Sequence, residues 1–368
     1  MRGGKSQSLT GFTLGVEEEF HVVDSETGRI RFAGPALAEH SAARTGRCAE
    51  PEMLACQVES STPVCRTLGD VRSEVLRMRR EVSGLAAEAG CRLIASGTYP
   101  ACHATPAVTP KRRYQEIVEA FGLVAREQLV CGCHVHVGVD DAEVAIAAMN
   151  RVRPWLAVLL ALSANSPFWR DEDTGYASFR TQVWSQWPAS GPPGAFSSRT
   201  EYDKVMRSLV DAGVLLDLGM LYWDVRPSQR FDTLEFRIAD VCLTADETVL
   251  IAGLIRALTA TCVEAARRDE PVCPLPHELL RAAHWQASRF GLGGNLIDPV
   301  LARPVPAASR VHDLLAYVRP ALKAFGDFDE VRALTEQTLA EGTGADRQRK
   351  AFGERNSLAG VFDLLTVR

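Results

Sequence analysis

The sequence predicts an α+β fold in which an antiparallel sheet is covered by helices on one side. The candidate strands alternate polar and apolar residues, whereas the central strands of a parallel sheet are near-continuous apolar runs. The segments between these strands carry apolar residues at three- and four-residue steps, which is typical of helices. No internal repeat or low-complexity linker divides the chain. We therefore expect a single domain over residues 1–368, with residues 1–10 flexible.

The predicted helices are marked by their spacing and by their ends. Residues Thr67–Gly90 place their apolar side chains on one face, and Thr67 with Asp70 resembles a capping box. Residues 140–165 form a second helix, which Pro154 should break or kink. Further helices are predicted at Thr244–Arg268, Pro276–Phe290 and Ala307–Ala324.

The predicted strands are shorter and lie between the helices. They are Thr13–Asp24, Glu52–Thr62, Arg92–Ser96, Gly132–Val139, Leu221–Arg226 and Thr233–Val241. A stretch between Asp171 and Asp203 is rich in Trp, Ser, Gly and Pro. A connection of this length is usually functional or disordered, and Trp184 and Trp187 argue against disorder.

Composition limits the classes of function. The chain has 368 residues, 46% hydrophobic and 24% charged, which excludes collagen-like, mucin-like and disordered proteins. The net charge of −5 argues against nucleic acid or an anionic membrane as the main partner. The strongly apolar stretch Trp155–Ala164 is far shorter than the roughly 20 residues that span a bilayer. We find no signal peptide, and the ten cysteines are scattered, so we expect reduced thiols in a cytoplasmic protein.

Acids and imidazoles gather on one face of the predicted sheet. Successive strand side chains point to opposite sides. Four strands therefore present a polar face opposite an aliphatic one, and the residues on it are Glu17, Glu19, Glu59, His134, His136, Glu235 and Arg237. Regular alternation would put Glu52 on the other face, unless a bulge or the strand entry redirects it.

This polar face has two interpretations. It could be the solvated side of a sheet, but such a face usually also carries Lys, Thr and Ser. Acids facing one another repel unless cations compensate, so we favour a metal-binding concave face. Carboxylates dominate it, which favours Mg²⁺ or Mn²⁺.

Several Mg²⁺ ions on a carboxylate-rich sheet are typical of ATP chemistry, in which the ions bridge the phosphates. The chain has no P-loop and no G-x-G-x-x-G motif followed by a helix. A nucleotide would therefore be held through metals and arginines.

Six motifs, in order, resemble the glutamate–cysteine ligase family, and specifically its short bacterial type 2 branch of carboxylate–amine ligases. They are Gly15-Val-Glu-Glu-Glu19, Gln57-Val-Glu-Ser-Ser-Thr-Pro63, Cys131-Gly-Cys-His-Val-His-Val-Gly138, Tyr176-Ala-Ser-Phe-Arg-Thr-Gln-Val-Trp184, Tyr222-Trp-Asp-Val-Arg-Pro227 and Thr233-Leu-Glu-Phe-Arg-Ile-Ala-Asp-Val241. The resemblance extends from about Gly11 to the C-terminus.

The resemblance implies a fold like the catalytic part of glutamine synthetase, with the antiparallel sheet forming an open funnel. It implies ATP-dependent phosphorylation of a carboxylate, that of glutamate for this family, and attack by the amine of cysteine on the acyl phosphate. The metal ligands that it implies are Glu17, Glu19, Glu52, Glu59, His134 and Glu235. Arg237, with Glu235, is implied as catalytic, since a guanidinium fork can pair two phosphoryl oxygens at once.

Other residues are weaker candidates. Arg180 and Arg226 are candidates for gripping substrate carboxylates, and salt bridges between elements are an equal alternative. His136 is a candidate for orienting a ligand or for the substrate site, or it is structural. Trp184 could stack on adenine or anchor its loop. The basic Gly-rich segment 342–350, with Arg347 and Arg349, could fold over the triphosphate or be a solvated face.

Three alternatives stay open at this level. A ligase of the same chemistry could act on another acid and amine, because the branch carries a generic name. A hydrolase could use His134 and His136 to bind Zn²⁺ and activate water. A scaffold could keep the fold without catalysis. Small-molecule substrates are expected in the first two cases, and the sequence leaves the oligomeric state open, a homodimer included.

Overall fold

A seven-stranded antiparallel sheet crosses the molecule. The computed structural model describes residues 9–44, 48–102 and 105–367. The strands of the sheet are β1 (Leu14–Asp24), β2 (Glu50–Pro51), β3 (Gln57–Ser61), β4 (Cys91–Ile94), β5 (Gly132–Gly138), β10 (Val225–Pro227) and β11 (Thr233–Asp240). Their order is β10-β11-β5-β1-β3-β2, and β4 pairs with the far end of β1. The predicted antiparallel sheet is therefore confirmed.

The strand register brings the polar residues of neighbouring strands together. Glu17 of β1 lies opposite His134 of β5, and Glu19 lies opposite Glu59 of β3. Residues directly opposite one another in an antiparallel pair point to the same side of the sheet. The acids predicted from alternation thus share one face across three strands.

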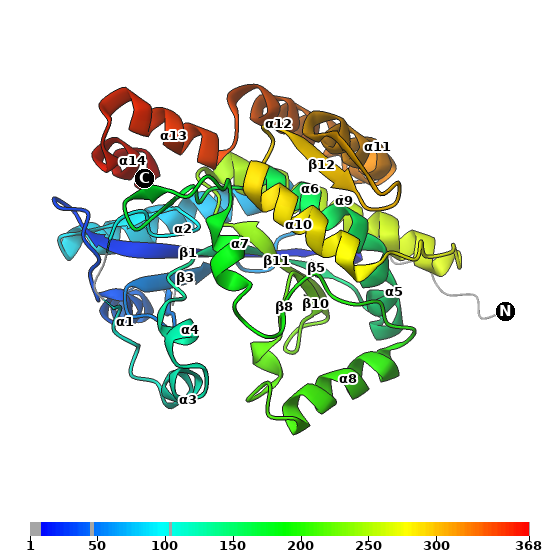
Figure 1. Ribbon diagram of the computed structural model, residues 1–368, viewed down its shortest axis with the longest axis horizontal. Coiled ribbons are helices and arrows are strands. Elements are labelled where there is room, and N and C mark those ends of the chain that lie inside the picture. Colours follow the sequence, from blue (N-terminus) through cyan, green and yellow to red (C-terminus); the bar gives the residue numbers. More distant parts are fainter. Residues whose placement is uncertain (1–8, 45–47, 103–104, 368) are drawn as a thin grey trace.

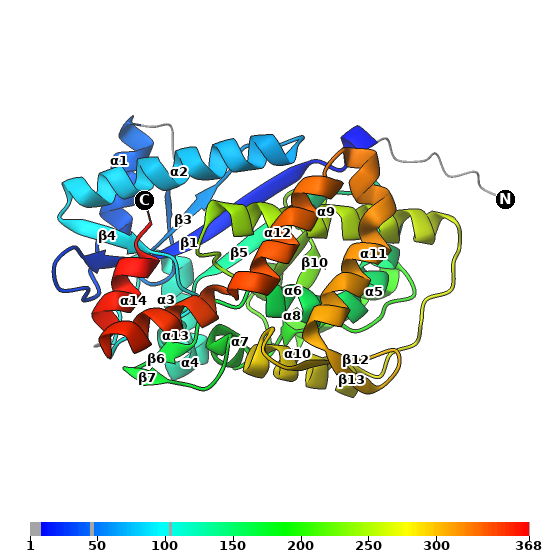
Figure 2. The ribbon, with the colours of Figure 1, turned by 90° about the horizontal axis from the view of Figure 1, so that it is seen from above.

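Helices cover the opposite, aliphatic face of the sheet (Figure 1). Val16, Val135 and Phe236 are fully or almost fully buried in the core between sheet and helices. The covering helices are α2 (Leu68–Glu88), α5 (Ala142–Val152), α6 (Leu156–Leu162) and α9 (Ala245–Arg267). A second layer packs against α9, as the view from above shows (Figure 2), and consists of α11 (Ala307–Phe325) and α12 (Phe328–Glu341).

The predicted helix ends are confirmed. Thr67 and Asp70 form a complete capping box at the start of α2, and Thr244 and Glu247 form another at the start of α9. Pro154 lies in the 3₁₀ turn η2 (Arg153–Trp155) that separates α5 from α6, since its ring cannot continue an α-helix.

Two helical segments are long and apolar enough to cross a membrane by composition alone. They are Ala142–Leu162 and Ala245–Arg267, and 72% and 83% of their most apolar windows are buried inside the molecule. The second segment lies between the sheet and the outer helices. Packing in the core therefore accounts for their hydropathy.

The remaining elements lie on both sides of the sheet. On the polar side, α3 and α4 lie below one end of the sheet in Figure 1 and α8 lies below the other. The helices are α1 (Gly34–Arg44), α3 (Arg112–Phe121), α4 (Leu123–Arg126), α7 (Phe179–Trp184), α8 (Arg199–Asp211), α10 (His277–Phe290), α13 (Gly344–Arg355) and α14 (Leu358–Leu365), with 3₁₀ turns η1 (Leu9–Gly11) and η3 (Leu218–Met220). The short strands are β6 (Phe168–Trp169), β7 (Glu172–Asp173), β8 (Ser190–Gly191), β9 (Tyr222–Trp223), β12 (Asn295–Asp298) and β13 (Arg303–Pro306).

Several sequence predictions need correction. The single strand predicted at Leu221–Arg226 is two strands, β9 and β10, which belong to different sheets. The strand predicted at Glu52–Thr62 begins only at Gln57, because the chain turns between β2 and β3. The connection between Asp171 and Asp203 contains α7, a helix too short for periodicity to reveal. The Gly-rich segment 342–350 is largely the first half of α13, whose capping box of Thr343 and Asp346 offsets its glycine. We expected residues 1–10 to be flexible. Residues 1–8 of this segment lie outside the described residues.

Candidate active site

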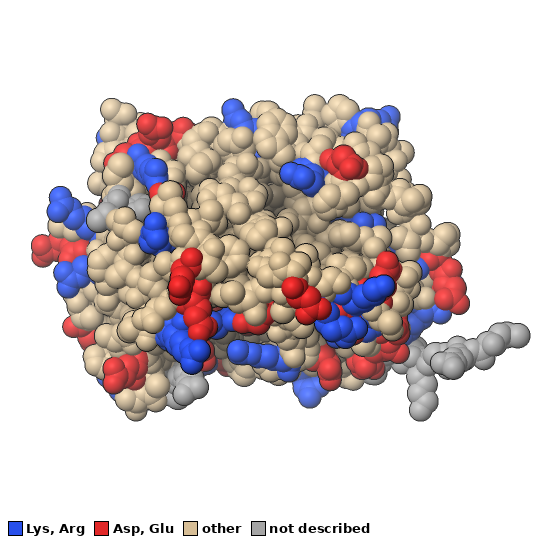
Figure 3. Space-filling model, turned by 60° about the horizontal axis from the view of Figure 1, so that its bottom comes forward, with Lys and Arg blue, Asp and Glu red and all other residues tan. Residues whose placement is uncertain are grey.

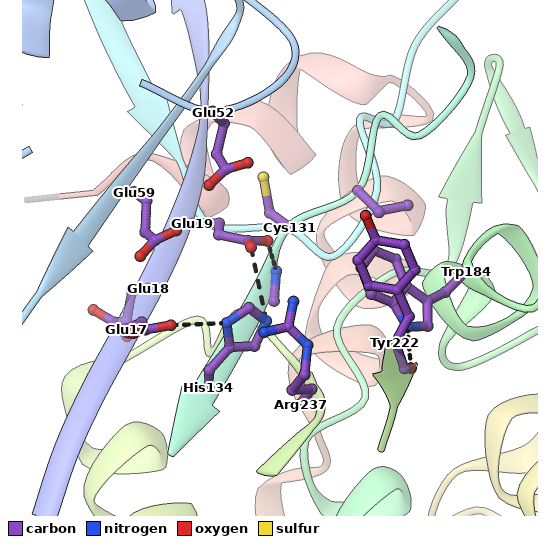
Figure 4. A network of polar contacts seen from close by, with 12 residues as sticks. Glu17, Glu18, Glu19, Glu52, Glu59, Cys131, His134, Trp184, Tyr222 and Arg237 are labelled. Carbon is purple, nitrogen blue, oxygen red and sulfur yellow. Dashed lines mark hydrogen bonds and ion pairs between the residues drawn. The ribbon is translucent and has the colours of Figure 1, made fainter. Parts of the chain in front are cut away.

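The predicted acids converge on the polar face of the sheet in two groups. Glu17, His136 and Glu235 form one group, and in it one ligand atom from each residue lies within 4.8 Å of the others. A second group meets the same criterion and consists of Glu19, Glu52 and Glu59. Figure 4 shows Glu17, Glu19, Glu52 and Glu59 around one space, with Arg237 facing them.

Glu52 joins the second group because of the turn before β3. A regular strand from Glu52 to Glu59 would have pointed these two side chains to opposite faces. The turn over residues 53–56 breaks the alternation, so that Glu52 reaches Glu19 and Glu59. Glu52, which the family resemblance implied as a metal ligand, thus lies with the other acids.

The two histidines have different partners. His134 lies between two carboxylates, with Nδ1 3.1 Å from Glu17 Oε2 and Nε2 3.7 Å from Glu19 Oε1. His136 Nδ1 lies 2.9 Å from the Thr233 hydroxyl, which leaves Nε2 facing Glu17 Oε1 at 3.3 Å without a hydrogen-bond partner among the described residues. Nε2 of His134 is likewise without a hydrogen-bond partner, but only His136 belongs to a group of described residues that could hold a metal ion, whereas we expected His134 to be the ligand.

The electrostatics of the site fit a divalent cation. Burial and the charges of Glu17 and Glu52 raise the pKa of Glu59 well above its usual range. Burial also raises the pKa of Glu19, although His134 acts against it. A cation would relieve this repulsion. Carboxylate oxygens with one imidazole are donors that suit Mg²⁺ or Mn²⁺.

Two arginines hold Glu235. Arg226 pairs with it through two hydrogen bonds, Nε to Oε2 at 2.9 Å and Nη2 to Oε1 at 3.2 Å, and Arg237 donates to the same carboxylate from Nη1. Burial alone would raise the pKa of Glu235, but the charges of Arg237 and Arg226 lower it well below its usual range. Arg226 also donates to the Leu221 carbonyl oxygen at 2.5 Å. Arg226 is therefore a support for Glu235, not the free substrate clamp that the sequence left open.

Two adjoining pockets open over these groups. The larger has a volume of 490 Å³ and the smaller 150 Å³. Both are lined by Glu17, Glu59, Arg113 and Arg237. In the view that brings this side of the molecule forward, acidic and basic side chains gather in one band (Figure 3). An anionic substrate could lie across both pockets, with its charge shared between cations and arginines.

Arg113 is a site residue that sequence reasoning missed. It lies in the first turn of α3 and forms an ion pair with Asp217, which precedes η3. This pair links two walls of the pockets, and a Cβ on Gly219 would lie only 2.8 Å from Arg113 Nη2. The signal in the sequence was the basic run Lys111–Arg113, which spans the start of this helix.

The remaining candidates from the sequence lie away from the two pockets or already have hydrogen-bond partners within the protein. Arg180 is almost completely buried, and it donates to the carbonyl oxygens of Arg237 and Ile238 at 3.1 and 3.3 Å. Trp184 lines the smaller pocket, but the guanidinium carbons of Arg180 and Arg237 lie 5.4 and 5.8 Å from its ring centroid. Its Nε1 donates to the Tyr222 carbonyl oxygen at 3.1 Å. Trp184 thus anchors the wall of the pocket.

Arg347 and Arg349 belong to α13 and line neither pocket. Arg347 pairs with Glu247 at the start of α9, and Arg349 pairs with Asp173 at 2.7 Å. The structure therefore does not bring these two arginines to the acids, and a segment closing over a triphosphate there is not supported by their contacts.

Comparisons with known proteins identify a family and relatives of this chain. A family model described as "Glutamate-cysteine ligase family 2(GCS2)" matches residues 13–360. A relative from Mycolicibacterium smegmatis, named "Putative glutamate--cysteine ligase 2-3", is 45% identical over 356 residues, which are 96% of this chain and 97% of the relative. A relative from Frankia alni, named "Putative glutamate--cysteine ligase 2-2", is 44% identical over 96% of both chains.

Solved structures resemble the fold. A glutamate–cysteine ligase from Francisella tularensis in complex with AMP matches with a TM-score of 0.72 at 10% identity, over 97% of this chain and 88% of that one. A bifunctional glutathione synthetase from Pasteurella multocida matches with a TM-score of 0.72 at 15% identity, over 97% of this chain and 52% of that one. At such low identities these structural matches show the fold alone. They confirm the α+β architecture.

The family match spans residues 13–360, a range that includes the strands carrying the acids. The expected enzyme class, an ATP-dependent carboxylate–amine ligase, is confirmed with it. The chain belongs to glutamate–cysteine ligase family 2.

Proposed function

We propose that this ligase joins the γ-carboxylate of glutamate to the amine of cysteine through an acyl phosphate, giving γ-glutamylcysteine, ADP and phosphate. One observation supports this chemistry. The two groups of candidate metal ligands and Arg237 line the same two adjoining pockets. The choice of glutamate and cysteine is supported by the names of the relatives. We also infer that residues 1–368 act as one catalytic domain in the cytoplasm on small-molecule substrates.

In the first step a carboxylate oxygen attacks the γ-phosphorus of ATP and ADP leaves with the electrons of the broken P–O bond. The two groups would hold Mg²⁺ or Mn²⁺, which would supply positive charge to neutralise the phosphates. Arg237 borders both pockets, and its guanidinium can donate to two oxygens of the transferring phosphoryl group. The Arg237 side chain is 12% exposed, so few water molecules can compete for these donors.

Glu235 has two roles in this arrangement. It offers an oxygen to the first metal group, and it fixes the guanidinium of Arg237 by an ion pair. In the second step the amine attacks the acyl carbon, phosphate leaves, and the amine loses a proton. The site offers several carboxylates that could accept that proton.

The alternative hydrolase would use His134 and His136 as zinc ligands. Their partners in the structure are carboxylates and a hydroxyl, and His134 belongs to neither metal group formed by the described residues. This geometry favours the ligase.

The test is ADP release with Mg²⁺ and ATP, measured with and without L-glutamate plus L-cysteine, and mass spectrometry of the product. γ-Glutamylcysteine together with ADP would support the proposal. ADP released only with another acid and amine would keep the ligase chemistry and refute the substrate pair. The absence of ADP with a full matrix of acids and amines would refute both.

Two variants test the residues. Glu235→Gln should abolish substrate-dependent ADP release, because it removes the charge that holds Arg237 and a metal. Arg237→Lys should lose about 10²- to 10³-fold in kcat, since a point charge cannot replace the guanidinium fork. Glu116→Gln is the matched control, because Glu116 pairs only with the exposed Arg112. Rates near that of the control in either variant would remove its residue from the mechanism.

A further inference from the structure

Arg153, in the turn between α5 and α6, is a buried arginine without an acidic partner. Six arginines are buried in the described part of the chain, and Arg153 is 3% exposed. The other five each pair with a buried acid, and the pairs are Arg79–Glu18, Arg180–Asp240, Arg226–Glu235, Arg256–Asp327 and Arg310–Asp298. Burial lowers the pKa of Arg153, and no acid among the described residues offsets this effect. A buried charge is costly unless it is paired, so the missing anion calls for an explanation.

The terminal nitrogens of this guanidinium are open to a ligand. Nε of Arg153 donates to the Asn150 carbonyl oxygen at 3.2 Å, whereas Nη1 and Nη2 have no hydrogen-bond partner among the described residues. Neither Nη atom belongs to the unpaired polar atoms of these residues that are sealed from solvent. Arg153 lines a cavity of 570 Å³. Arg151 lines it as well and adds positive charge, although its Nη1 donates to the Ala147 carbonyl oxygen at 2.9 Å. The open end of the Arg153 fork is therefore within reach of a molecule in this cavity.

This cavity, the α5–α8 pocket, lies between α5, the start of α8 and residues 272–274. It shares no lining residue with the two active-site pockets. Asn150 fixes one wall, because its Nδ2 donates to the Phe196 carbonyl oxygen at 2.6 Å and its Oδ1 accepts from the Phe196 N–H at 3.1 Å. Ile146, Phe196 and Pro274 add apolar surface. A cavity with a cation and apolar walls suits a molecule that combines an anionic group with an apolar body.

Two carboxylates that line the pocket limit the charge of its ligand. Glu201 accepts hydrogen bonds from the Ser197 N–H and hydroxyl, both at 2.6 Å, and Glu143 accepts one from the Arg199 N–H at 2.8 Å. These bonds hold both acids at the start of α8, and neither acid forms an ion pair with Arg153. Their negative charge repels a dianion such as phosphate more strongly than a monoanion. A carboxylate therefore fits the pocket better than a phosphate group.

We propose that the α5–α8 pocket binds a small organic monocarboxylate, whose two oxygens pair with Nη1 and Nη2 of Arg153 and whose apolar body lies against Phe196. The guanidinium fork matches the two oxygens of a carboxylate. The bound anion gives Arg153 the partner that the other buried arginines have within the chain. This site is separate from the ligase site and does not depend on the proposed function.

The experiment is isothermal titration calorimetry of the full chain with 3-phenylpropionate and with its amide, 3-phenylpropanamide. The two probes have nearly the same shape, and only the first carries a negative charge. The wild type should bind the carboxylate roughly 10- to 100-fold more tightly than the amide. In Arg153→Met this ratio should fall towards one. Because the substitution removes a buried charge that lacks a partner, the Tm of Arg153→Met should be no lower than that of the wild type.

Two variants serve as controls. Arg332→Met removes the same charge from an exposed position of α12 and should keep the wild-type ratio. Arg237→Lys alters the active site and should keep it too, because Arg237 does not line the α5–α8 pocket. If Arg153→Met keeps the ratio, or if Arg237→Lys loses it, the inference is wrong.

A second variant keeps the test decisive if Arg153→Met fails to fold. Ala195 lines the pocket and is exposed, so Ala195→Trp should narrow the cavity and weaken binding of the carboxylate by at least about 10-fold while Arg153 stays in place. Unchanged affinity in this variant would overturn the inference. Failure of the wild type to bind 3-phenylpropionate would overturn it too, as would tighter binding of inorganic phosphate than of the carboxylate. These measurements involve no ATP and no turnover, so they are separate from the ADP assay.

Discussion

Removing Arg79 should be one of the most destabilising single substitutions in this protein. Glu18 lies on the aliphatic face of β1, between Glu17 and Glu19 of the site, and both Glu18 and Arg79 are almost completely buried. Arg79 of α2 pairs with it through two hydrogen bonds, at 2.9 and 2.6 Å. This salt bridge lies in the core of the protein, not at the edge of the sheet.

The magnitude follows from these contacts. Arg79 also donates to the carbonyl oxygens of Cys242 and Leu243, and Thr248 donates to Glu18 at 2.7 Å. Arg79→Met leaves a buried carboxylate without its cation, which costs about 3–5 kcal/mol. At about 2.1 cal/mol/K of unfolding entropy per residue, this lowers Tm by roughly 4–6 °C for a chain of this size.

The assay is thermal unfolding followed by circular dichroism, for Arg79→Met, Glu18→Leu and the double variant. The double variant should be more stable than Arg79→Met, because it removes the uncompensated charge along with its partner. Arg332→Met is the control, because its nearest acid, Asp329, is 3.7 Å away and exposed. A Tm of Arg79→Met within 1 °C of that control, or a double variant whose loss equals the sum of the single losses, would refute the reasoning.

Three further predictions concern the site. In EDTA, Glu59→Gln should be more stable than the wild type at pH 8 and should lose that advantage at pH 5. Burial and neighbouring acids raise the pKa of Glu59 in the folded protein. The protonated side chain is therefore tolerated at low pH, and its contribution to stability is lost as the pH rises through the folded pKa. Melting curves at both pH values check this, and a variant that melts below the wild type at pH 8 would contradict it. Arg113→Ala should lower kcat/KM for ADP release by roughly 10-fold or more while Tm changes little, since the pair with Asp217 is half exposed and such pairs contribute about 0–1 kcal/mol. A kinetic assay combined with a melting curve checks both parts, and unchanged kinetics would assign Arg113 a purely structural role. Arg349→Ala should leave the KM for ATP within about twofold of the wild type, because Arg349 pairs with Asp173 away from both pockets; a large rise in that KM would return the C-terminal segment to the ATP site.

The sequence alone determined which side chains share a face. Strand alternation is a local property of the backbone with a period of two, so Glu17 with Glu19, and Glu235 with Arg237, could be placed together without a structure. Helix caps such as that of Thr67 are local as well, because the side chain bonds to a backbone group three residues away. The fold class followed from the same patterns.

Only the tertiary structure decided how these faces meet. The register between β5 and β11 places His136 opposite Glu235, which is why His136 rather than His134 enters a metal group. The turn before β3 brings in Glu52, and α3 brings in Arg113 to meet Asp217, 104 residues later in the chain. Such contacts depend on packing between distant segments, and no spacing within one segment encodes them. The same reason explains why the two pockets over the polar face could not be seen in the sequence.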